Sequence, residues 1–516
     1  MTAPSTRPAS EPQTGAEGHT GVLVIVCTAL FFGVVNGSAV AVVLPEIGAD
    51  LDIAEGNLSW VLSGFLLTYG VAIPFYGRLA GRFGARRLFL VGVMLFAVGS
   101  ALSALATGLV TLLAARTVQA VGGAAVPGLG MTLASRAFPE QRRGFVLGVI
   151  SATMGVAAAA GPLGAGVVTE IADWRYLFAI SALSVVTVPF GVRHLDRHEA
   201  LTDEPLDLRG GVLFGVGVAA LLYVVTRGSQ AGWTDGLALA GAMVSVVALS
   251  ILVRHQAHEA TPFIPRTLVA NRRYLLLTLL GFMVTFANLA AQIGYPFLFN
   301  SVHGMSSLDI GVALIPAALT TAVLGVIAGR LVDRVGPASP LRVGAVLMIV
   351  GTIAKSTWVG GSVWTIAVLA MVFGAGFALV NTPLATAVSL LVHPRDLAAA
   401  LSLNTMMFFI GGSFGSSLFT SIVISATPEA DAVNPIHTGA GAGFSNAFLA
   451  LVLPIAIGLG VSAALPGKTA DRSRPDGPAD QMPEDGPDQP SASSPSAGRR
   501  DARRSRISSS TVAGTR

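Results

Sequence analysis

The 516-residue chain has little charge. Only 12% of its residues are charged, 53% are hydrophobic, and the mean hydropathy is +0.70. A soluble globular protein carries about 25% charged residues, so this composition leaves too little polar surface to face water. The net charge of +4 owes much to arginines near the C-terminus and forms no nucleic-acid footprint. The sequence therefore predicts a membrane protein that lies in a lipid bilayer and has no nucleic-acid partner.

Residues that do chemistry are also scarce. Cys27 is the only cysteine, which excludes an intramolecular disulfide and a multi-cysteine metal site. The eight histidines fall near charged or turn-rich segments, which argues against a metal site or proton relay inside the membrane. An embedded enzyme would need convergent His, Asp, Cys or Ser within its spans, and the sequence has no such cluster. We therefore expect no enzymatic activity, no cofactor and no metal.

Long apolar runs dominate the chain. Runs of about 20 residues can cross a ~30 Å hydrocarbon core, and they are too long and too uniformly apolar for barrel strands. The predicted fold is all-α and polytopic, with roughly fourteen membrane helices. The expected starts are Gly21, Leu58, Leu88, Val110, Gly144, Arg175, Arg209, Gly236, Tyr274, Ile310, Leu341, Val363, Ala399 and Phe444.

An internal repeat predicts how the spans are grouped. The segment Gly-Arg-Leu-Ala-Gly-Arg-Phe-Gly at 77–84 recurs as Gly-Arg-Leu-Val-Asp-Arg-Val-Gly at 329–336, an offset of 252 residues. Both copies follow the second span of a six-span set if the seventh and eighth spans are an inserted pair, which gives a 6+2+6 arrangement. Glycine- and arginine-rich turns that serve topology alone are the alternative. The predicted domains are a disordered tail (1–20), a six-helix bundle (21–193), a linker with the inserted pair (194–273), a second six-helix bundle (274–465) and a disordered tail (466–516).

The arginines predict the orientation. With the N-terminus inside, eighteen arginines fall in cytoplasmic loops, whereas only Arg175, Arg227 and Lys355 fall in outer loops or outer span ends. Positive charge is retained on the cytoplasmic side of a membrane. We therefore expect a multi-pass protein of the cell membrane with both termini in the cytoplasm. The eighteen are Arg78, Arg82, Arg86, Arg87, Arg136, Arg142, Arg143, Arg193, Arg197, Arg209, Arg254, Arg266, Arg272, Arg273, Arg330, Arg334, Arg342 and Arg395.

Four motifs together resemble those of a known family. They are the repeated loop, Arg-Thr-Val-Gln-Ala-Val-Gly-Gly at 116–123, Gly155 followed by Gly-Pro-Leu-Gly-Ala-Gly at 161–166, and Leu-Pro-Glu-Ile at 44–47. In this order they resemble a fourteen-span major facilitator of the drug–proton antiporter type, similar to the tetracycline-resistance efflux proteins. The resemblance implies two rocking bundles with a midplane substrate site. It further implies efflux of a drug-like or secondary-metabolite compound, multidrug or antibiotic resistance, and protons as a second partner.

The motif residues suggest gates and a buried charge. Arg116 lies about six residues, or ~9 Å, inside the membrane from the outer end of its span. It is either a fixed positive charge that acts in transport or a snorkelling side chain bonded to Gln119. Asp333 can cap a helix and lock one face, whereas the first copy of the loop has Gly81 at this place. The predicted gating residues are Gly77, Arg78, Gly84, Arg86, Arg87, Gly161, Pro162, Gly166, Asp333 and Arg334.

The acids that would bind protons are missing from the spans. Similar antiporters carry an acid in span one and another in span thirteen, but the matching places here hold Asn36 or Gly37 and Gly411. Amides and glycines cannot exchange a proton. Asp207 and Glu46, at the mouths of spans seven and one, are the nearest substitutes. The sequence therefore predicts coupling that is weak or takes an atypical route. A facilitator or importer of a small organic solute is the alternative function.

Aromatic and amide residues define the candidate substrate cavity. A midplane pocket lined by rings and a few amides suits a large amphipathic organic molecule, because apolar area supplies most of the affinity. Packing or lipid contact is the alternative role for such residues in membrane helices. The candidates are Phe65, Tyr69, Asn288, Gln292, Asn381 and Asn404, with Phe408 and Phe409 beside them.

Overall fold

The fold is an assembly of membrane-length helices. The computed structural model describes residues 16–53, 58, 60–196, 205–305, 307–426, 432–437 and 441–463. Within these residues, fourteen helices are long and apolar enough to cross a membrane. Each begins within four residues of its predicted start. The prediction of an all-α polytopic protein with fourteen spans is therefore confirmed.

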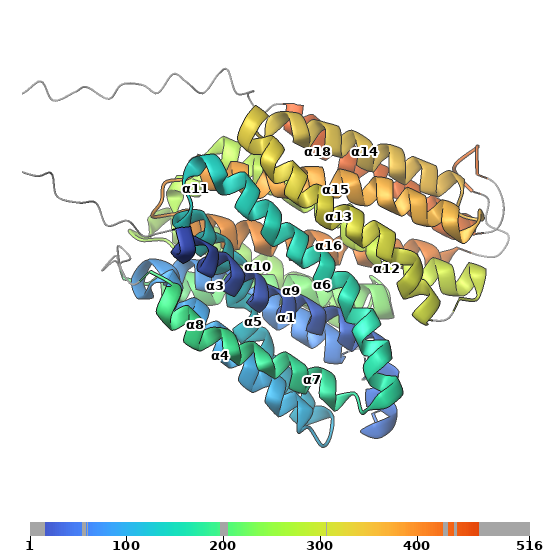
Figure 1. The fold of residues 1–516 in the computed structure, drawn as a ribbon, viewed down its shortest axis with the longest axis horizontal. Coiled ribbons are helices and arrows are strands. Elements are labelled where there is room, and N and C mark those ends of the chain that lie inside the picture. Colours follow the sequence, from blue (N-terminus) through green and yellow to red (C-terminus); the bar gives the residue numbers. More distant parts are fainter. Residues whose placement is uncertain are drawn as a thin grey trace, which may run out of the picture. The chain divides into compact units, whose positions relative to one another are not determined.

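The spans fall into two bundles of six and an inserted pair (Figure 1). The first bundle contains α1 (Ala16–Asp50), α3 (Trp60–Phe83), α4 (Ala85–Ala104), α5 (Leu109–Ala137), α6 (Arg143–Ile171) and a sixth span formed by α7 (Arg175–Ala182), a 3-10 turn (Leu183–Val186) and α8 (Thr187–His194). The inserted pair is α9 (Leu208–Ala231) and α10 (Gly236–His258). After α11 (Arg266–Ala270), the second bundle contains α12 (Arg272–His303), α13 (Ser307–Val335), α14 (Ala338–Thr357), α15 (Val363–Leu391), α16 (Leu397–Ser425) and a last span formed by α17 (Ala442–Ala450) and α18 (Val452–Ala463).

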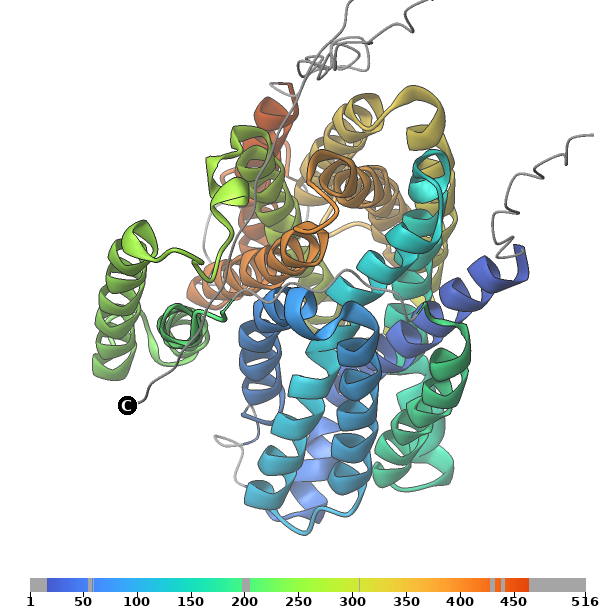
Figure 2. The ribbon, with the colours of Figure 1, turned by 90° about the vertical axis from the view of Figure 1, so that its left-hand side faces the viewer.

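The inserted pair packs against the side of the bundles. Helix α9 contacts α3 and α16, and α10 packs on α9. In Figure 2 the light green α10 accordingly lies at the edge of the helices. The segment after α10 is held by Phe263, whose ring lies 5.1 Å from that of Phe75 and 5.3 Å from that of Phe214. The pair therefore lies beside the contact between α3 and α16 and touches both bundles.

The first predicted tail, 1–20, overlaps the start of α1, which begins at Ala16. The rest of that tail and nearly all of the tail 466–516, together with Arg197, lie outside the described residues. The proposed domain boundaries remain predictions.

The internal repeat is visible in the backbone. The last glycine of each loop copy has a left-handed conformation, with φ of 85° at Gly84 and 84° at Gly336. Only glycine adopts this conformation without strain, and it turns the chain sharply between two spans. The first glycine of each copy lies where helices of different bundles meet: Gly77 on α3 faces Ser402 of α16, and Gly329 on α13 faces Gly144 of α6. In each copy, therefore, the last glycine turns the chain between two spans and the first glycine lets helices of the two bundles approach closely.

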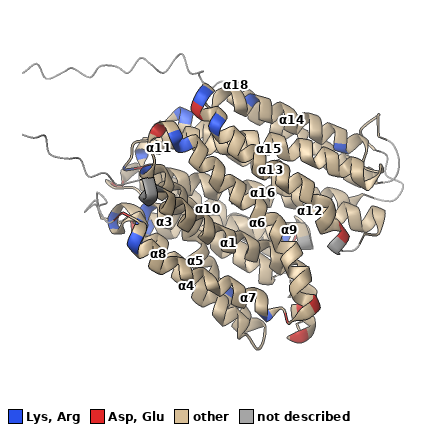
Figure 3. Ribbon diagram, viewed as in Figure 1, with Lys and Arg blue, Asp and Glu red and all other residues tan. Residues whose placement is uncertain are grey.

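The two bundles meet along two helix pairs. Helix α6 packs on α13, and α3 packs on α16. Arg and Lys residues, blue in Figure 3, gather at one end of the helices. We call this the arginine-rich end, where α3 and α13 end and α6 begins. The contacts at this end decide whether the bundles can separate there.

Candidate functional site

Arg116 lies at the centre of a polar network in the first bundle. Its side chain is 1% exposed, so it does not snorkel out of the bundle. Its guanidinium donates to the Oδ1 atom of Asn36 (2.9 Å), the Oε1 atom of Gln119 (2.7 Å) and the backbone oxygen of Val61 (3.4 Å). These acceptors belong to α1, α5 and α3. The buried charge thus joins three helices through neutral oxygens.

A second layer extends the network to two more helices. Asn36 donates to Ser181 Oγ of α7 (3.0 Å), and Gln119 donates to Ser100 Oγ of α4 (2.7 Å). The guanidinium also stacks on Phe65, with 4.0 Å between its central carbon and the ring centroid. The Nη2 atom of Arg116 is buried without a hydrogen-bond partner among the described residues. Sequence analysis anticipated the Gln119 contact but not that Asn36 binds the same charge.

Aromatic rings connect this network to the second bundle. Phe65 stacks on Tyr69, with centroids 5.6 Å apart, and Tyr69 meets Phe409 of α16 edge-on at 4.9 Å. Phe409 in turn contacts Phe408, whose ring faces Phe377 of α15. Tyr69 and Phe409 are half-buried. Two predicted cavity residues and the two phenylalanines beside them therefore form one aromatic row across the bundle interface.

The predicted cavity amides of the second bundle differ in their burial. Asn288 and Asn404 are buried, and each has a side-chain atom, Nδ2 and Oδ1 respectively, without a partner among the described residues. Asn381 is half-buried and Gln292 is exposed. Asn288 follows Asn36 by the repeat offset of 252 residues. Its amide donor, unlike that of Asn36, has no hydrogen-bond partner among the described residues.

Asp333 forms the latch at the arginine-rich end. Its carboxylate accepts hydrogen bonds from the backbone N–H groups of Gly144 and Phe145, both at 2.9 Å. These groups begin α6 in the other bundle, where unpaired N–H donors and the helix dipole favour a negative charge. Two further bonds between the bundles lie nearby, from Arg136 to the oxygen of Pro394 (3.2 Å) and from Arg143 to that of Ser389 (3.4 Å). The arginine-rich end is therefore closed.

The remaining loop residues lie around this latch. Arg86 donates to the oxygen of Val192 (2.7 Å) within the first bundle. Arg78 is half-buried, whereas Arg87 and Arg334 are exposed. The carboxylate of Asp333 therefore contacts the other bundle together with Arg136 and Arg143, whereas the bond from Arg86 lies within the first bundle.

The glycines of α6 contact two different neighbours. A Cβ atom at Gly161 would meet Ser38 Oγ and lie 2.9 Å from the oxygen of Val35, so this glycine lets α6 approach α1 of its own bundle. Gly166 has no atom within 4 Å of such a Cβ. Pro162 stands within the helix beside them. The contact with the second bundle instead uses Gly144 and other glycines nearer the start of α6.

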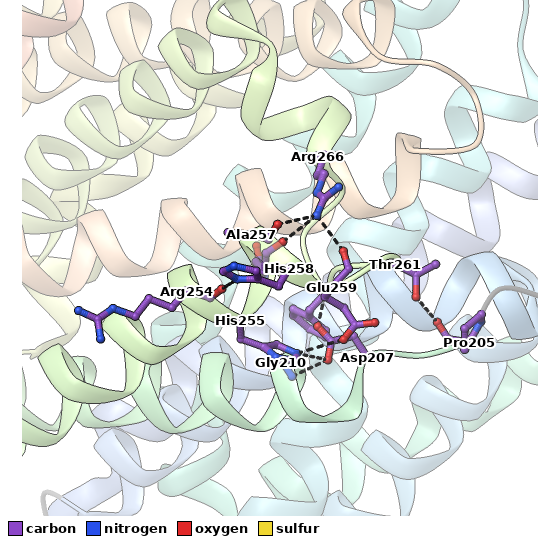
Figure 4. A network of polar contacts seen from close by, with 12 residues as sticks. Pro205, Asp207, Gly210, Arg254, His255, Ala257, His258, Glu259, Thr261 and Arg266 are labelled. Carbon is purple, nitrogen blue, oxygen red and sulfur yellow. Dashed lines mark hydrogen bonds and ion pairs between the residues drawn. The ribbon is translucent and has the colours of Figure 1, made fainter.

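Asp207 is a structural centre of the inserted pair (Figure 4). Its side chain is 2% exposed and caps α9 by accepting from the N–H of Gly210 (2.7 Å). It also accepts from the N–H of Phe263 (3.1 Å) and pairs with His255 Nε2 of α10 (2.8 Å). Burial alone would raise the pKa of Asp207, but the bonds from His255, Gly210 and Phe263 outweigh it and lower this pKa. This carboxylate therefore stays ionised.

Glu259 completes a group of three possible metal ligands. Its Oε2 atom lies 3.7 Å from His255 Nε2, and one ligand atom from each of Asp207, His255 and Glu259 falls within 4.8 Å of the others. Because both oxygens of Asp207 already accept hydrogen bonds, the geometry is that of an ion pair and a helix cap. Arg266 strengthens the same corner by donating to three backbone oxygens at the end of α10.

The second coupling candidate, Glu46, is half-buried on α1.

We expect the substitution Asp207→Ala to destabilise the protein by about 1–3 kcal/mol, because two backbone donors and His255 lose their acceptor. Since folding lowers the pKa of Asp207, its contribution is present above its unfolded value of about 3.9 and fades as the pH falls through the folded value. Thermal unfolding in detergent should therefore show a large difference from the wild type at neutral pH and a smaller one in acid. The matched control is Asp235→Ala, a cap of α10 whose side chain is 22% exposed against 2% for Asp207, so it should lose less stability. An equal loss in both variants would contradict the assignment.

One cavity of about 570 Å³ lies beside the first bundle. Its walls come from α3, α4, α5 and α9 and include Leu67, Val71, Phe75, Val91 and Ala219. It contains none of the predicted cavity residues. The cavity is an apolar groove under the inserted helix α9 and is separate from the aromatic row between the bundles.

Two six-span bundles, an inserted pair and a latch between the bundles define a polytopic transporter of the two-bundle type. The family model of the Major Facilitator Superfamily matches residues 25–416. The chain belongs to this superfamily.

Two relatives and one solved structure resemble the chain. The cephamycin export protein CmcT of Amycolatopsis lactamdurans is 30% identical over 444 residues, covering 81% of this chain and 88% of the relative. The riboflavin transporter RibZ of Clostridioides difficile is 25% identical over 407 residues, covering 77% and 88%. The crystal structure of the human organic anion transporter MFSD10 superposes with a TM-score of 0.63 at 14% identity, covering 88% of this chain and all of that one. The last likeness concerns the fold alone.

Proposed function

We propose that the protein exports a drug-like or secondary-metabolite amphipathic compound by alternating access, driven by the proton gradient. The observation that supports this most is the closed arginine-rich end, where Asp333 binds the start of α6 across the bundle interface. A latch made of two hydrogen bonds can open without unfolding either bundle. Transport by rocking needs this kind of reversible closure.

The aromatic row and the two free amides support the substrate class. Tyr69 and Phe409 offer half-buried ring surface at the interface, and Asn288 and Asn404 offer one donor and one acceptor. Apolar contact with a few placed polar groups is typical of sites for mid-sized organic molecules. The relative CmcT carries export and a cephamycin in its name, which agrees with an amphipathic export substrate.

A facilitator that moves solute down its gradient is the second candidate. Asn36 and Gly411 occupy the places where similar antiporters carry acids, and the structure gives both a packing role. Asn36 binds Arg116, and a Cβ at Gly411 would meet the backbone oxygen of Phe282. Neither place can exchange a proton. This observation favours movement without proton coupling.

Proteoliposomes with an imposed pH gradient and membrane potential distinguish the two functions. Purified protein is reconstituted and challenged with a cephamycin and with riboflavin, the compounds named for the two relatives. One charge moved across 100 mV is worth about 2.3 kcal/mol, which sustains roughly a 40-fold gradient. We expect uphill movement of at least one compound, of roughly tenfold or more. Ratios that stay at one, with equilibration faster than in protein-free vesicles, would contradict export and support the facilitator.

We further propose that the arginine-rich end faces the cytoplasm of the cell, as do both termini. Retention of positive charge on that side is the physical reason. Single cysteines in a Cys27→Ser background, placed at Arg82, Arg142 and Arg334, should resist a membrane-impermeant maleimide in intact cells. A cysteine at Trp233, which lies in the turn between α9 and α10 and is 46% exposed, should react rapidly. The reverse pattern would overturn the orientation.

A further inference from the structure

The chain uses lysine almost nowhere. Of its 32 basic residues, only Lys355 and Lys468 are lysines. Lys468 lies outside the described residues. Lys355 stands on α14, two residues before the end of that helix, and is 1% exposed. Sequence analysis counted it among the outer span-end charges, but the structure buries it. A charge that served topology alone would lie at the surface.

Aromatic rings enclose the Lys355 amine. Its Nζ atom lies 3.7 Å from the ring centroid of Phe373, 4.9 Å from that of Phe448 and 5.0 Å from that of Tyr295. These rings come from α15, α17 and α12. The amine also donates to the Tyr295 hydroxyl at 3.0 Å. We call these three residues and Lys355 the lysine cage.

No carboxylate pairs with Lys355 among the described residues. Within the described part of the chain, the titratable group bonded to the amine is the Tyr295 hydroxyl. The rings attract an ammonium ion through their π faces, while removal from water opposes the charge. The charged form is therefore favoured by one effect and disfavoured by the other. A site that holds a proton reversibly needs such opposing effects.

A lysine at this site can lose its proton, whereas an arginine cannot. Arg116, the buried cation of the first bundle, stays protonated at any accessible pH and is bound by amide oxygens. The Lys355 amine can release its proton and become neutral. In the neutral form its lone pair can accept the hydrogen bond of the Tyr295 hydroxyl, so the 3.0 Å contact serves both states. The cage therefore suits either form of the amine.

The cage lies near the end of its span. Beside it, Ser356 Oγ contacts Ser445 Oγ (3.0 Å) and accepts from Asn434 of the segment 432–437 (3.0 Å). In the same segment His437, half-buried, approaches the backbone oxygen of Ser356 at 3.3 Å. Polar groups thus continue from the neighbour of Lys355 toward the end of the bundle opposite the latch. A proton from that side has a short distance to travel.

We infer that Lys355 is a proton-exchanging group of the transport cycle and takes the place of the missing carboxylates. The inference rests on the proposed export function. A proton from the side opposite the latch binds the lone pair of the Lys355 amine and gives an ammonium ion. When the bundles change conformation, the ammonium returns this proton to the other side. No other bond is formed or broken.

Two lysines make the test direct. In a Lys468→Arg background, lysine labelled with ¹⁵N at Nζ gives a single side-chain signal by NMR in lipid nanodiscs. We expect this signal to change between the ammonium and amine forms within the pH range over which the protein stays folded. An ammonium signal that stays constant over this range would overturn the inference, whether or not the protein exports anything.

Transport by variants provides the second arm, with riboflavin and a cephamycin as probes. Lys355→Arg keeps the charge but cannot release a proton, so it should lose the accumulation driven by the pH gradient, by roughly tenfold or more, while downhill exchange remains. Lys355→Met should lose accumulation as well. Full accumulation in the Arg variant would overturn the role of Lys355 and leave export standing. Absence of accumulation in the wild type, with a signal that titrates, would instead contradict export.

Discussion

Replacing Arg116 with lysine is expected to reduce transport by roughly tenfold or more while expression stays near that of the wild type. The guanidinium reaches Asn36, Gln119 and Val61 on three helices and stacks on the ring of Phe65. A lysine ammonium is a point charge without a planar face or a fork of donors. It can satisfy one or two of these acceptors but not all of them together with the stacking. Each buried acceptor left unpaired costs about 1–3 kcal/mol.

The same exchange at a partly exposed ion pair provides the control for Arg116→Lys. Arg227 binds Asp235 at 3.2 Å, with about a third of its side chain exposed. Arg227 Nη2 also reaches the second oxygen of Asp235 at 3.5 Å. A lysine keeps one of these two contacts, and loss of the other at a partly exposed pair costs little, so Arg227→Lys should transport normally. Initial rates in proteoliposomes, corrected for the amount of folded protein, give the comparison. Undiminished transport by Arg116→Lys would mean that a positive charge alone suffices at this site.

The fold could be read from the sequence because its determinants are local. Apolar runs of span length predicted all fourteen helices, and the repeated loop predicted the 6+2+6 grouping. The left-handed glycines at Gly84 and Gly336 show why both copies of the loop end in the same residue.

The site could be predicted only in part, because its contacts join distant helices. Sequence spacing placed Gln119 three residues after Arg116, within reach on one helix. It could not show that Asn36, eighty residues away, binds the same guanidinium. Nor could spacing show that Lys355 is surrounded by rings from three other helices. A scan for the rarest charged residue type would have singled out Lys355.

Asp207 shows that the sequence gives the position of an acid but not its contacts. As an acid at the mouth of a span, it was a candidate for proton coupling. In the structure both of its oxygens accept hydrogen bonds that hold the inserted pair together, and folding lowers its pKa. These bonds favour the charged carboxylate in this conformation, and the sequence alone shows none of them.

The largest effect on the latch is expected from Gly329→Val. Gly329 of α13 lies against the backbone of α6: a Cβ atom there would meet the oxygen of Gly144 and lie 3.1 Å from the Cα atom of Phe145. Backbone cannot move aside as a flexible side chain can, so the valine must push the two helices apart. Overpacking of this kind costs typically 1–3 kcal/mol, which changes the population of the closed state by roughly 5- to 150-fold. The variant should fold, because the clash lies between the bundles rather than within one.

Gly166→Val in α6 is the matched control for Gly329→Val. No atom lies within 4 Å of a Cβ at that position, so the same added side chain meets open space and transport should be normal. In Gly329→Val, a cysteine introduced at Ser402, which lies beside Gly77 at the other bundle contact, should react faster with maleimide from the arginine-rich end than in the wild type. Slow labelling together with normal transport in Gly329→Val would show that the close approach of α6 and α13 is not required for closure. Fast labelling with lost transport would instead tie the rocking of the bundles to this one backbone contact, with the carboxylate of Asp333 one helical turn away.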